Sequence, residues 1–393
     1  MKVLIAPDSF KSTLTSIQAV EIIADVFKSE DFKTHSVPIG DGGEGTVDAL
    51  IYSLGGKKKY IEVLDPLGRK IKTYYGIKNK TAFIEISKAA GLMLLDESEY
   101  NPSQTTTIGF GQMINDALHN GADKIYLGLG GTATNDAGIG MLSALGVKFF
   151  DKTGDEIQGF LCGSMLEKID KIDDSCITGL IKKIEFIVIS DVRNALTGKN
   201  GAAKIFAKQK GADLLMVEEL EKGMLHYASI IKNTFGIEPE FQGAGAAGGV
   251  GVSIKAFLNA TINPGIECVI DLLGLEKIIP EYDLIIVGEG SMDYQTAFGK
   301  APVGIARIAK KYNKKVIAIA GKLGKDADSL YKEGIDLIFS YYGDVEVNLE
   351  YIKKHSEKML KETANLAKYI IITNPNLKNK KFTCYETENL YHT

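Results

Sequence analysis

Lys2-Val3-Leu4-Ile5-Ala6-Pro7-Asp8-Ser9-Phe10-Lys11-Ser12-Thr13 opens the chain with a short apolar run and a polar loop. Such a run, bounded by proline and polar residues, is typical of a buried strand. Thr15 and Gln18 then have the spacing of a helix capping box. The apolar residues behind them recur at helical spacing, at Val20, Ile23, Ala24 and Phe27. The segment therefore predicts the order strand, loop, helix.

The same order returns twice more along the chain. His35–Ile39 is a second predicted strand, followed by the loop Asp41–Thr46 and an amphipathic helix. Near the other end, Leu284–Val287 is a predicted strand, and Pro302 stands where the first turn of a helix tolerates proline. Two more strands are expected at Val316–Ala320 and Leu337–Ser340. Alternating strands and helices predict a doubly wound parallel sheet.

The middle of the chain has a different pattern. Tyr60–Leu64, Ile71–Ile77 and Ala82–Ile86 read as successive strands joined by turns, which favours a mixed, partly antiparallel sheet. We therefore expect an α/β protein in which residues 63–278 form a mixed α/β domain. This domain is inserted into a discontinuous one made of residues 1–62 and 279–393, which carries the parallel sheet. From about Asn374 the chain lacks periodicity and is predicted to be a surface tail.

Composition excludes several classes of function. A formal net charge of −4 and a pI near 5.9 argue against a nucleic-acid-binding protein. The four cysteines are scattered, without the spacing of a zinc site or a disulfide framework. No apolar run is long enough for a signal peptide core or a membrane span. The sequence thus predicts a cytoplasmic protein with no membrane partner.

Three loops combine glycines with acidic or hydroxyl residues directly after apolar runs. They are Asp41–Thr46, Gly128–Asp136 and Gly288–Asp293. Glycine lets backbone N–H groups converge on an anion, so such loops suit phosphate. Carboxylates in the same loops would repel a bare phosphate, which favours a bridging divalent cation or a base acting on a hydroxyl. Together the loops indicate phosphoryl transfer.

Two further motifs are open to more than one interpretation. Asp191 ends the apolar run Phe186–Ser190, where an aspartate can ligate Mg²⁺, accept a hydroxyl proton or simply cap a turn. Gly243-x-Gly245-x-x-Gly248 has the spacing of a dinucleotide fingerprint, which keeps a nicotinamide-dependent oxidoreductase as an alternative. No apolar strand precedes it, however. A non-catalytic bilobal sensor of small hydroxy acids is a third hypothesis.

Seven segments in the same order resemble the bacterial glycerate kinase family of the first type, nearly throughout the chain to about residue 370. They are Ile5–Lys11, Asp41–Thr46, Asp65–Arg69, Gly130–Asp136, Ser190–Val192, Gly243–Gly249 and Gly288–Asp293 with Gly299 and Lys300. The resemblance implies an ATP-dependent kinase that phosphorylates D-glycerate, most often to 2-phosphoglycerate. It also implies two dissimilar α/β domains, one flavodoxin-like, with the active site in the cleft between them.

On this basis we expect Mg²⁺ and ATP at the glycine-rich loops of the inserted domain, and glycerate beside the first loop. The catalytic candidates are Asp191, Lys11 and Asp293. The residues expected to bind glycerate are Asp8, Ser9, Lys11, Asp41, Glu44 and Arg69. Those expected to bind the nucleotide phosphates are Gly130, Gly131, Thr132, Thr134, Asn135, Asp136, Gly243, Gly245 and Gly248. Candidate metal ligands are Asp191 and Glu289. The sequence leaves open the choice of hydroxyl and the oligomeric state, a homo-oligomer included.

Overall fold

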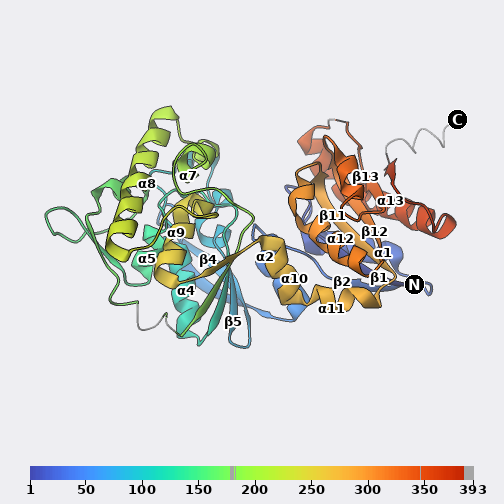
Figure 1. Ribbon diagram of the computed structural model, residues 1–393, viewed down its shortest axis with the longest axis horizontal. Coiled ribbons are helices and arrows are strands. Elements are labelled where there is room, and N and C mark those ends of the chain that lie inside the picture. Colours follow the sequence, from blue (N-terminus) through green and yellow to red (C-terminus); the bar gives the residue numbers. More distant parts are fainter. Residues whose placement is uncertain (178–180, 182, 346, 385–393) are drawn as a thin grey trace. The chain divides into compact units, whose positions relative to one another are not determined.

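Two α/β units make up the part of the chain that the computed structural model describes, which is every residue except 178–180, 182, 346 and 385–393. Unit 1 contains Met1–Asp41, Asp48–Gly55 and the chain from Ile266 onward. Unit 2 contains Gly42–Val47 and Gly56–Gly265. The chain therefore passes from one unit to the other four times. Figure 1 labels the main helices and strands of both units.

Unit 1 is built on six parallel strands in the order β14-β13-β12-β11-β1-β2. The strands are β1 (Lys2–Pro7), β2 (Lys33–Ser36), β11 (Leu284–Met292), β12 (Lys315–Leu323), β13 (Leu337–Ser340) and β14 (Lys380–Thr383). The helices are α1 (Ser16–Phe27), α2 (Thr46–Leu54), α10 (Gly265–Leu273), α11 (Leu275–Ile278), α12 (Ala301–Lys311) and α13 (Leu349–Thr373). The predicted capping box of α1 is confirmed, because Thr15 and Gln18 satisfy each other's backbone N–H groups.

Both faces of this sheet are buried, as in a doubly wound fold. Val3 and Ile5 pack with α1 and α13 in one apolar cluster, and the intervening Leu4 is equally buried on the opposite face. Helix α13 contributes residues at helical spacing to that cluster, namely Leu360, Ala364, Ala367 and Ile371. The sequence prediction of a doubly wound parallel sheet is confirmed.

Unit 2 contains a mixed sheet in the order β10-β9-β6-β5-β4-β3. Its strands are β3 (Lys57–Leu64), β4 (Lys70–Lys78), β5 (Thr81–Glu85), β6 (Lys124–Gly128), β9 (Glu185–Ile189) and β10 (Thr261–Asn263). The first three pair antiparallel and the others pair parallel. A small antiparallel pair is formed by β7 (Lys148–Phe150) and β8 (Lys171–Asp173). The helices are α3 (Ser87–Ala90), α4 (Ile108–His119), α5 (Ile139–Ala144), α7 (Ala202–Phe206), α8 (Leu214–Phe235) and α9 (Ala246–Leu258).

The expected boundaries between the two domains were 62/63 and 278/279. In the structure the corresponding boundaries between the units lie at 55/56 and 265/266. Strand β3 pairs with β4 along its whole length, so residues 57–62 belong with unit 2. At the other junction, a Cβ atom on Gly304 of α12 would lie 2.8 Å from Ile266 of α10. This close packing places α10 and α11 with unit 1. Backbone pairing and helix packing, which the local pattern does not show, set both limits.

The prediction of a surface tail from about Asn374 is wrong for part of that segment. Residues Lys380–Thr383 form β14, an edge strand that pairs parallel with β13. The Phe382 ring stacks on Phe339, with ring centroids 5.1 Å apart. Phe382 is the one apolar residue of this strand and follows two exposed lysines, so the segment lacks the apolar alternation that predicts a strand. Charged residues are common on edge strands because they discourage pairing with other chains.

Among the described residues, no helix combines the length and the apolar character needed to cross a membrane.

Phe382→Ala tests whether β14 stabilises the sheet. Because the half-buried ring loses its stacking on Phe339, we expect the free energy of unfolding of unit 1 to fall by about 1–2 kcal/mol. Urea denaturation monitored by circular dichroism measures this loss. Lys380→Ala, which changes an exposed residue of the same strand, should alter stability by less than about 0.5 kcal/mol. Equal stability of both variants would contradict the assigned strand.

Candidate active site

The sheet of unit 1 changes winding direction at β1, which lies between β2 and β11. Ligands of doubly wound sheets bind at the carboxyl ends of strands beside such a point. In the parallel register Pro7 lies opposite Gly288, and the Asp8 N–H donates to the Gly288 carbonyl at 2.8 Å. The pairing therefore places Asp8, which follows β1, close to Glu289 of β11.

A group of charged side chains surrounds this point in unit 1. Asp8 is only 7% exposed, and its burial, followed by the nearby Asp41 carboxylate, raises its pKa to about 8. The Ser9 N–H, which donates to Asp8 Oδ1 at 2.6 Å, and Lys11 oppose this increase. Lys11 Nζ lies 3.2 Å from Asp41 Oδ2 on a side chain that is 74% exposed. The predicted residues Asp8, Ser9, Lys11 and Asp41 are thus brought together.

Glu289 extends this charged group along β11. It is buried, and burial raises the pKa of its carboxyl group. The Thr296 hydroxyl donates to Glu289 Oε1 at 2.6 Å, and Lys300 Nζ lies 3.6 Å from Oε2. Asp293 differs from Glu289 in its contacts, because its Oδ1 accepts the backbone N–H groups of Gln295 and Thr296. The structure thus shows Asp293, a predicted catalytic residue, as the cap of a tight turn.

A pocket of about 300 Å³ lies next to this group in unit 1. Lys11, Glu289 and Lys300 form part of its wall. The remaining wall is largely aromatic and aliphatic, and includes Phe10, Tyr341, Tyr342 and Ile352. Charged groups and apolar surface are therefore adjacent at the carboxyl ends of β1, β11, β12 and β13.

In unit 2, two predicted glycine loops meet at the carboxyl ends of β6 and β9. Gly42 has a φ of +92°, and a Cβ atom there would lie 2.1 Å from the Ile189 carbonyl oxygen. The Gly130 N–H donates to the Gly42 carbonyl at 3.0 Å, and a Cβ atom on Gly130 would lie 2.6 Å from the Cα of Gly43. Only glycines permit this crossing. Glu44 in the same loop is exposed.

Asp191 follows β9 at the same edge of the unit 2 sheet. Its side chain is exposed, and Oδ1 accepts the N–H of Gly265, the first residue of α10, at 2.9 Å. This contact is the capping role that the sequence left open. The Asp191 carboxylate is nevertheless exposed, at the end of a buried strand.

Several polar side chains of the loop Gly130–Asp136 are buried within unit 2. The side chains of Thr134, Asn135 and Asp136 are fully buried. Asp136 Oδ2 accepts both the N–H and the hydroxyl of Thr107, and Oδ1 accepts the Gly138 N–H. Burial raises the pKa of this carboxyl group. Asp136 therefore fixes the starts of α4 and α5, while contact of these three side chains with a nucleotide remains a prediction.

Lys210 is a buried cation that sequence reasoning missed. Its Nζ donates to the Thr134 carbonyl at 2.6 Å and to the Thr132 hydroxyl at 3.1 Å. Burial lowers the pKa of Lys210 to about 8, against the opposing effect of Asp136. Lys208-Gln209-Lys210 reads like a surface segment, so no local signal marks this lysine. Lys210 supports the loop from within unit 2.

The glycines of the apparent dinucleotide fingerprint are explained by packing within unit 2. A Cβ atom on Gly245 would lie 2.1 Å from the Ala195 carbonyl oxygen, and one on Gly248 would lie 2.1 Å from that of Thr134. Gly243, with a φ of +94°, begins the turn into α9. No strand precedes the motif between residues 236 and 242. The nicotinamide hypothesis thus loses the observation on which it rested.

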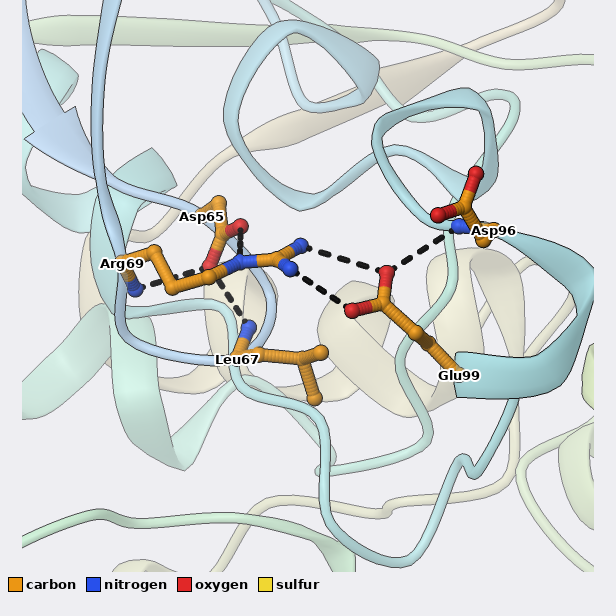
Figure 2. Close-up of polar contacts among 5 residues, drawn as sticks. All are labelled: Asp65, Leu67, Arg69, Asp96 and Glu99. Carbon is orange, nitrogen blue, oxygen red and sulfur yellow. Dashed lines mark hydrogen bonds and ion pairs between the residues drawn. The ribbon is translucent and has the colours of Figure 1, made fainter.

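Arg69 is held by two carboxylates of unit 2, as Figure 2 shows. Its Nε lies 2.6 Å from Asp65 Oδ2, and one terminal nitrogen lies 2.7 Å from Glu99 Oε1. Asp65 also accepts the N–H groups of Leu67 and Arg69, and Glu99 accepts that of Asp96. Arg69, predicted to bind glycerate, therefore closes a turn in this structure.

The candidate metal ligands fall in different units. Asp191 belongs to unit 2 and Glu289 to unit 1, and no group of three or more His, Cys, Asp or Glu suited to a metal occurs among the described residues. Mg²⁺ is usually held by one or two carboxylates together with substrate phosphates, so it does not require such a group. The carboxylate oxygens of Asp41 and Glu289 in unit 1 fit this chemistry, because both carboxylates lie close enough to Asp8 to add to the increase in its pKa that burial mainly causes.

The chain is similar to known proteins over nearly its whole length. Residues 3–371 match the model of the glycerate kinase family. The chain is 41% identical to glycerate 2-kinase of Escherichia coli K12, over 95% of this chain and 98% of that protein. It is 43% identical to glycerate kinase of Bacillus cereus, over 93% and 96% of the two chains.

A solved structure extends the likeness to three dimensions. The crystal structure described as "putative glycerate kinase 2" from Salmonella typhimurium LT2 is similar to this chain, with a TM-score of 0.83 and 37% identity. The similarity covers 96% of this chain and 100% of that one. The chain therefore belongs to the glycerate kinase family.

Proposed function

We propose that the protein transfers the γ-phosphoryl group of ATP to a hydroxyl group of D-glycerate, giving 2-phosphoglycerate. The observation that carries this proposal is the family match over residues 3–371, combined with the charged group at the switch point of the unit 1 sheet. Both relatives named above are called glycerate kinases, and the E. coli protein is called a 2-kinase. That name supports the choice of the 2-hydroxyl.

In this proposal Lys11 and Asp8 bind the carboxylate of glycerate. The exposed Lys11 ammonium attracts it, and Asp8, with a pKa of about 8, carries a proton at neutral pH that it can donate in a hydrogen bond. Mg²⁺, held by Asp41 and Glu289, would neutralise charge on the phosphates when bound. Lys300 beside Glu289 adds a second cation in unit 1. Arg69 keeps its structural role.

We assign the hydroxyl proton to Asp191. This carboxylate is exposed at the end of β9, beside the loops of Gly42 and Gly130, and one oxygen is fixed by the Gly265 N–H. A positioned carboxylate of this kind can accept the proton as the phosphoryl group is transferred.

We further propose a cytoplasmic location. No disulfide joins the four cysteines, all of which lie in the described part of the chain, and this agrees with a reducing compartment. A homo-oligomer stays a prediction.

The activity itself is tested with purified protein in a coupled assay of ADP release. We expect release that depends on both D-glycerate and Mg²⁺ and stops when EDTA removes the metal, because the carboxylates require a bridging cation. Phosphorus NMR of the product distinguishes 2-phosphoglycerate from 3-phosphoglycerate. Absence of glycerate-dependent ADP release across neutral pH and several divalent metals would refute the kinase.

Asp191→Asn separates the catalytic role from the capping role. The amide oxygen still accepts the Gly265 N–H, so Tm should barely change, whereas loss of a base or metal ligand should lower kcat on the order of 10²-fold or more. Asp213→Asn is the matched control, since Asp213 also caps a helix of unit 2 and asparagine is an equally good cap. Near-normal turnover of Asp191→Asn would exclude Asp191 from the reaction. A large fall in Tm would instead leave capping as its role.

Asp8→Asn tests the burial of the Asp8 carboxyl group. Its folded pKa, about 8, exceeds the ordinary value of 3.8, so the folded protein holds a proton that the unfolded chain has released. The resulting loss of stability grows as the pH rises from about 4 to 8, and asparagine avoids it. The variant should therefore be more stable than the wild type above pH 8 by more than about 1 kcal/mol, and this advantage should shrink toward pH 4.

Thermal unfolding at several pH values measures this difference. Asp283→Asn, which removes an exposed carboxylate from the same unit, serves as the control and should show no such growth. A constant difference between Asp8→Asn and wild type across this range would show that Asp8 is ionised in the folded protein.

A further inference from the structure

Two buried tyrosines whose hydroxyl groups lack partners line the pocket in unit 1. Tyr341 is 1% exposed and Tyr342 is 3% exposed, and both line the pocket. Within the described part of the chain, neither hydroxyl oxygen has a hydrogen-bond partner. Buried polar groups are nearly always satisfied, so an orphan pair beside a pocket indicates that a bound molecule or water completes the bonds.

The rest of the pocket restricts what that molecule can be. Phe10, Tyr342 and Ile352 give it apolar walls, which a ligand must cover with a flat or aliphatic body. Glycerate, with a carboxylate and two hydroxyl groups on three carbons, has no such part. A volume of about 300 Å³ lies at the lower end of the range of roughly 300–1,000 Å³ typical of ligand sites.

The charges at the pocket add a second requirement. Lys11, Lys300 and Lys322 line it, and lysine is a common ligand of phosphate groups. Lys11 and Glu289 belong both to the pocket wall and to the charged group around Asp8. A ligand that fits both parts has an aromatic, hydrogen-bonding body at one end and phosphates at the other.

We propose that this pocket binds the adenine nucleotide, with the purine against Tyr341, Tyr342 and Ile352 and the phosphates toward Lys11 and Lys300. A tyrosine hydroxyl both donates and accepts, so the pair can match a ring nitrogen and the exocyclic amino group. The base then lies in unit 1 and not on the glycine loops of unit 2. This inference rests on the proposed use of ATP and specifies where ATP is held.

Photolabelling with 8-azido-ATP followed by peptide mass spectrometry locates the base directly. Labelled peptides containing residues 9–11 or 341–352 would support the proposal. Label confined to residues 130–136 or 243–251, or no label that excess ATP prevents, would overturn it. If the label maps to the pocket but glycerate elicits no ADP release, the kinase assignment fails and the pocket stands. If ADP is released while the label maps to unit 2, the kinase stands and the pocket proposal fails.

Tyr342→Phe tests the hydroxyl group without changing the ring. We expect the Kd for ATP, measured by isothermal titration calorimetry, to rise about two- to tenfold, which corresponds to the loss of one hydrogen bond. The Kd for inorganic tripolyphosphate, which has no base, should stay within about twofold. Tyr331→Phe is the matched control, because the Tyr331 hydroxyl is also buried without a described partner but does not line the pocket. Equal effects on ATP and tripolyphosphate, or none on ATP, would contradict a base in this pocket.

Discussion

The parallel pairing of β1 with β11 is the contact on which the candidate site of unit 1 depends. It joins segments about 280 residues apart in sequence, with Pro7 opposite Gly288. That register places Asp8 beside Glu289 and opens the pocket at the ends of the same strands. A shift by one residue would move alternate side chains to the opposite face of the sheet and separate these groups. The buried Val3 and Ile5, packed with α1 and α13, hold the register in place.

Electrostatic strain is concentrated at this contact. Two buried carboxyl groups, Asp8 and Glu289, have raised pKa values, and the lysines near them offset only part of the penalty of burial. Perturbed carboxyl groups of this kind are common where a protein binds charged substrates, because the ligand supplies the missing partner. In unit 2 the buried Lys210 and Asp136 are instead satisfied by backbone and hydroxyl groups, which suits a supporting role.

Local patterns in the sequence were sufficient to predict most strands and the start of α1. They also predicted Asp8, Lys11 and Asp41 as candidate site residues. The structure brings these three together, because all three follow predicted strands and the carboxyl ends of parallel strands meet at one edge. They were less reliable where a side chain has a local structural use. Asp65 and Asp293 each begin a turn, and this chemistry accounts for Arg69 and Asp293 without any ligand. The burial of Lys210, the packing of Gly248 and the pairing of β14 all depend on distant segments, which local patterns do not contain.

The insertion of unit 2 also determines the order in which the protein can fold as it is made. Residues 56–265 leave the ribosome before β11, so the mixed sheet can form while β1 still lacks its neighbour. During that interval β1 can pair with β2 alone, and the apolar edge of Val3, Leu4 and Ile5 stays open to other chains. A pause in translation within unit 2 would lengthen this exposure, and expression at high levels would raise the number of chains exposed at the same time. A chaperone that covers this edge would therefore act at a stage when unit 2 can already be folded and the sheet of unit 1 is still incomplete.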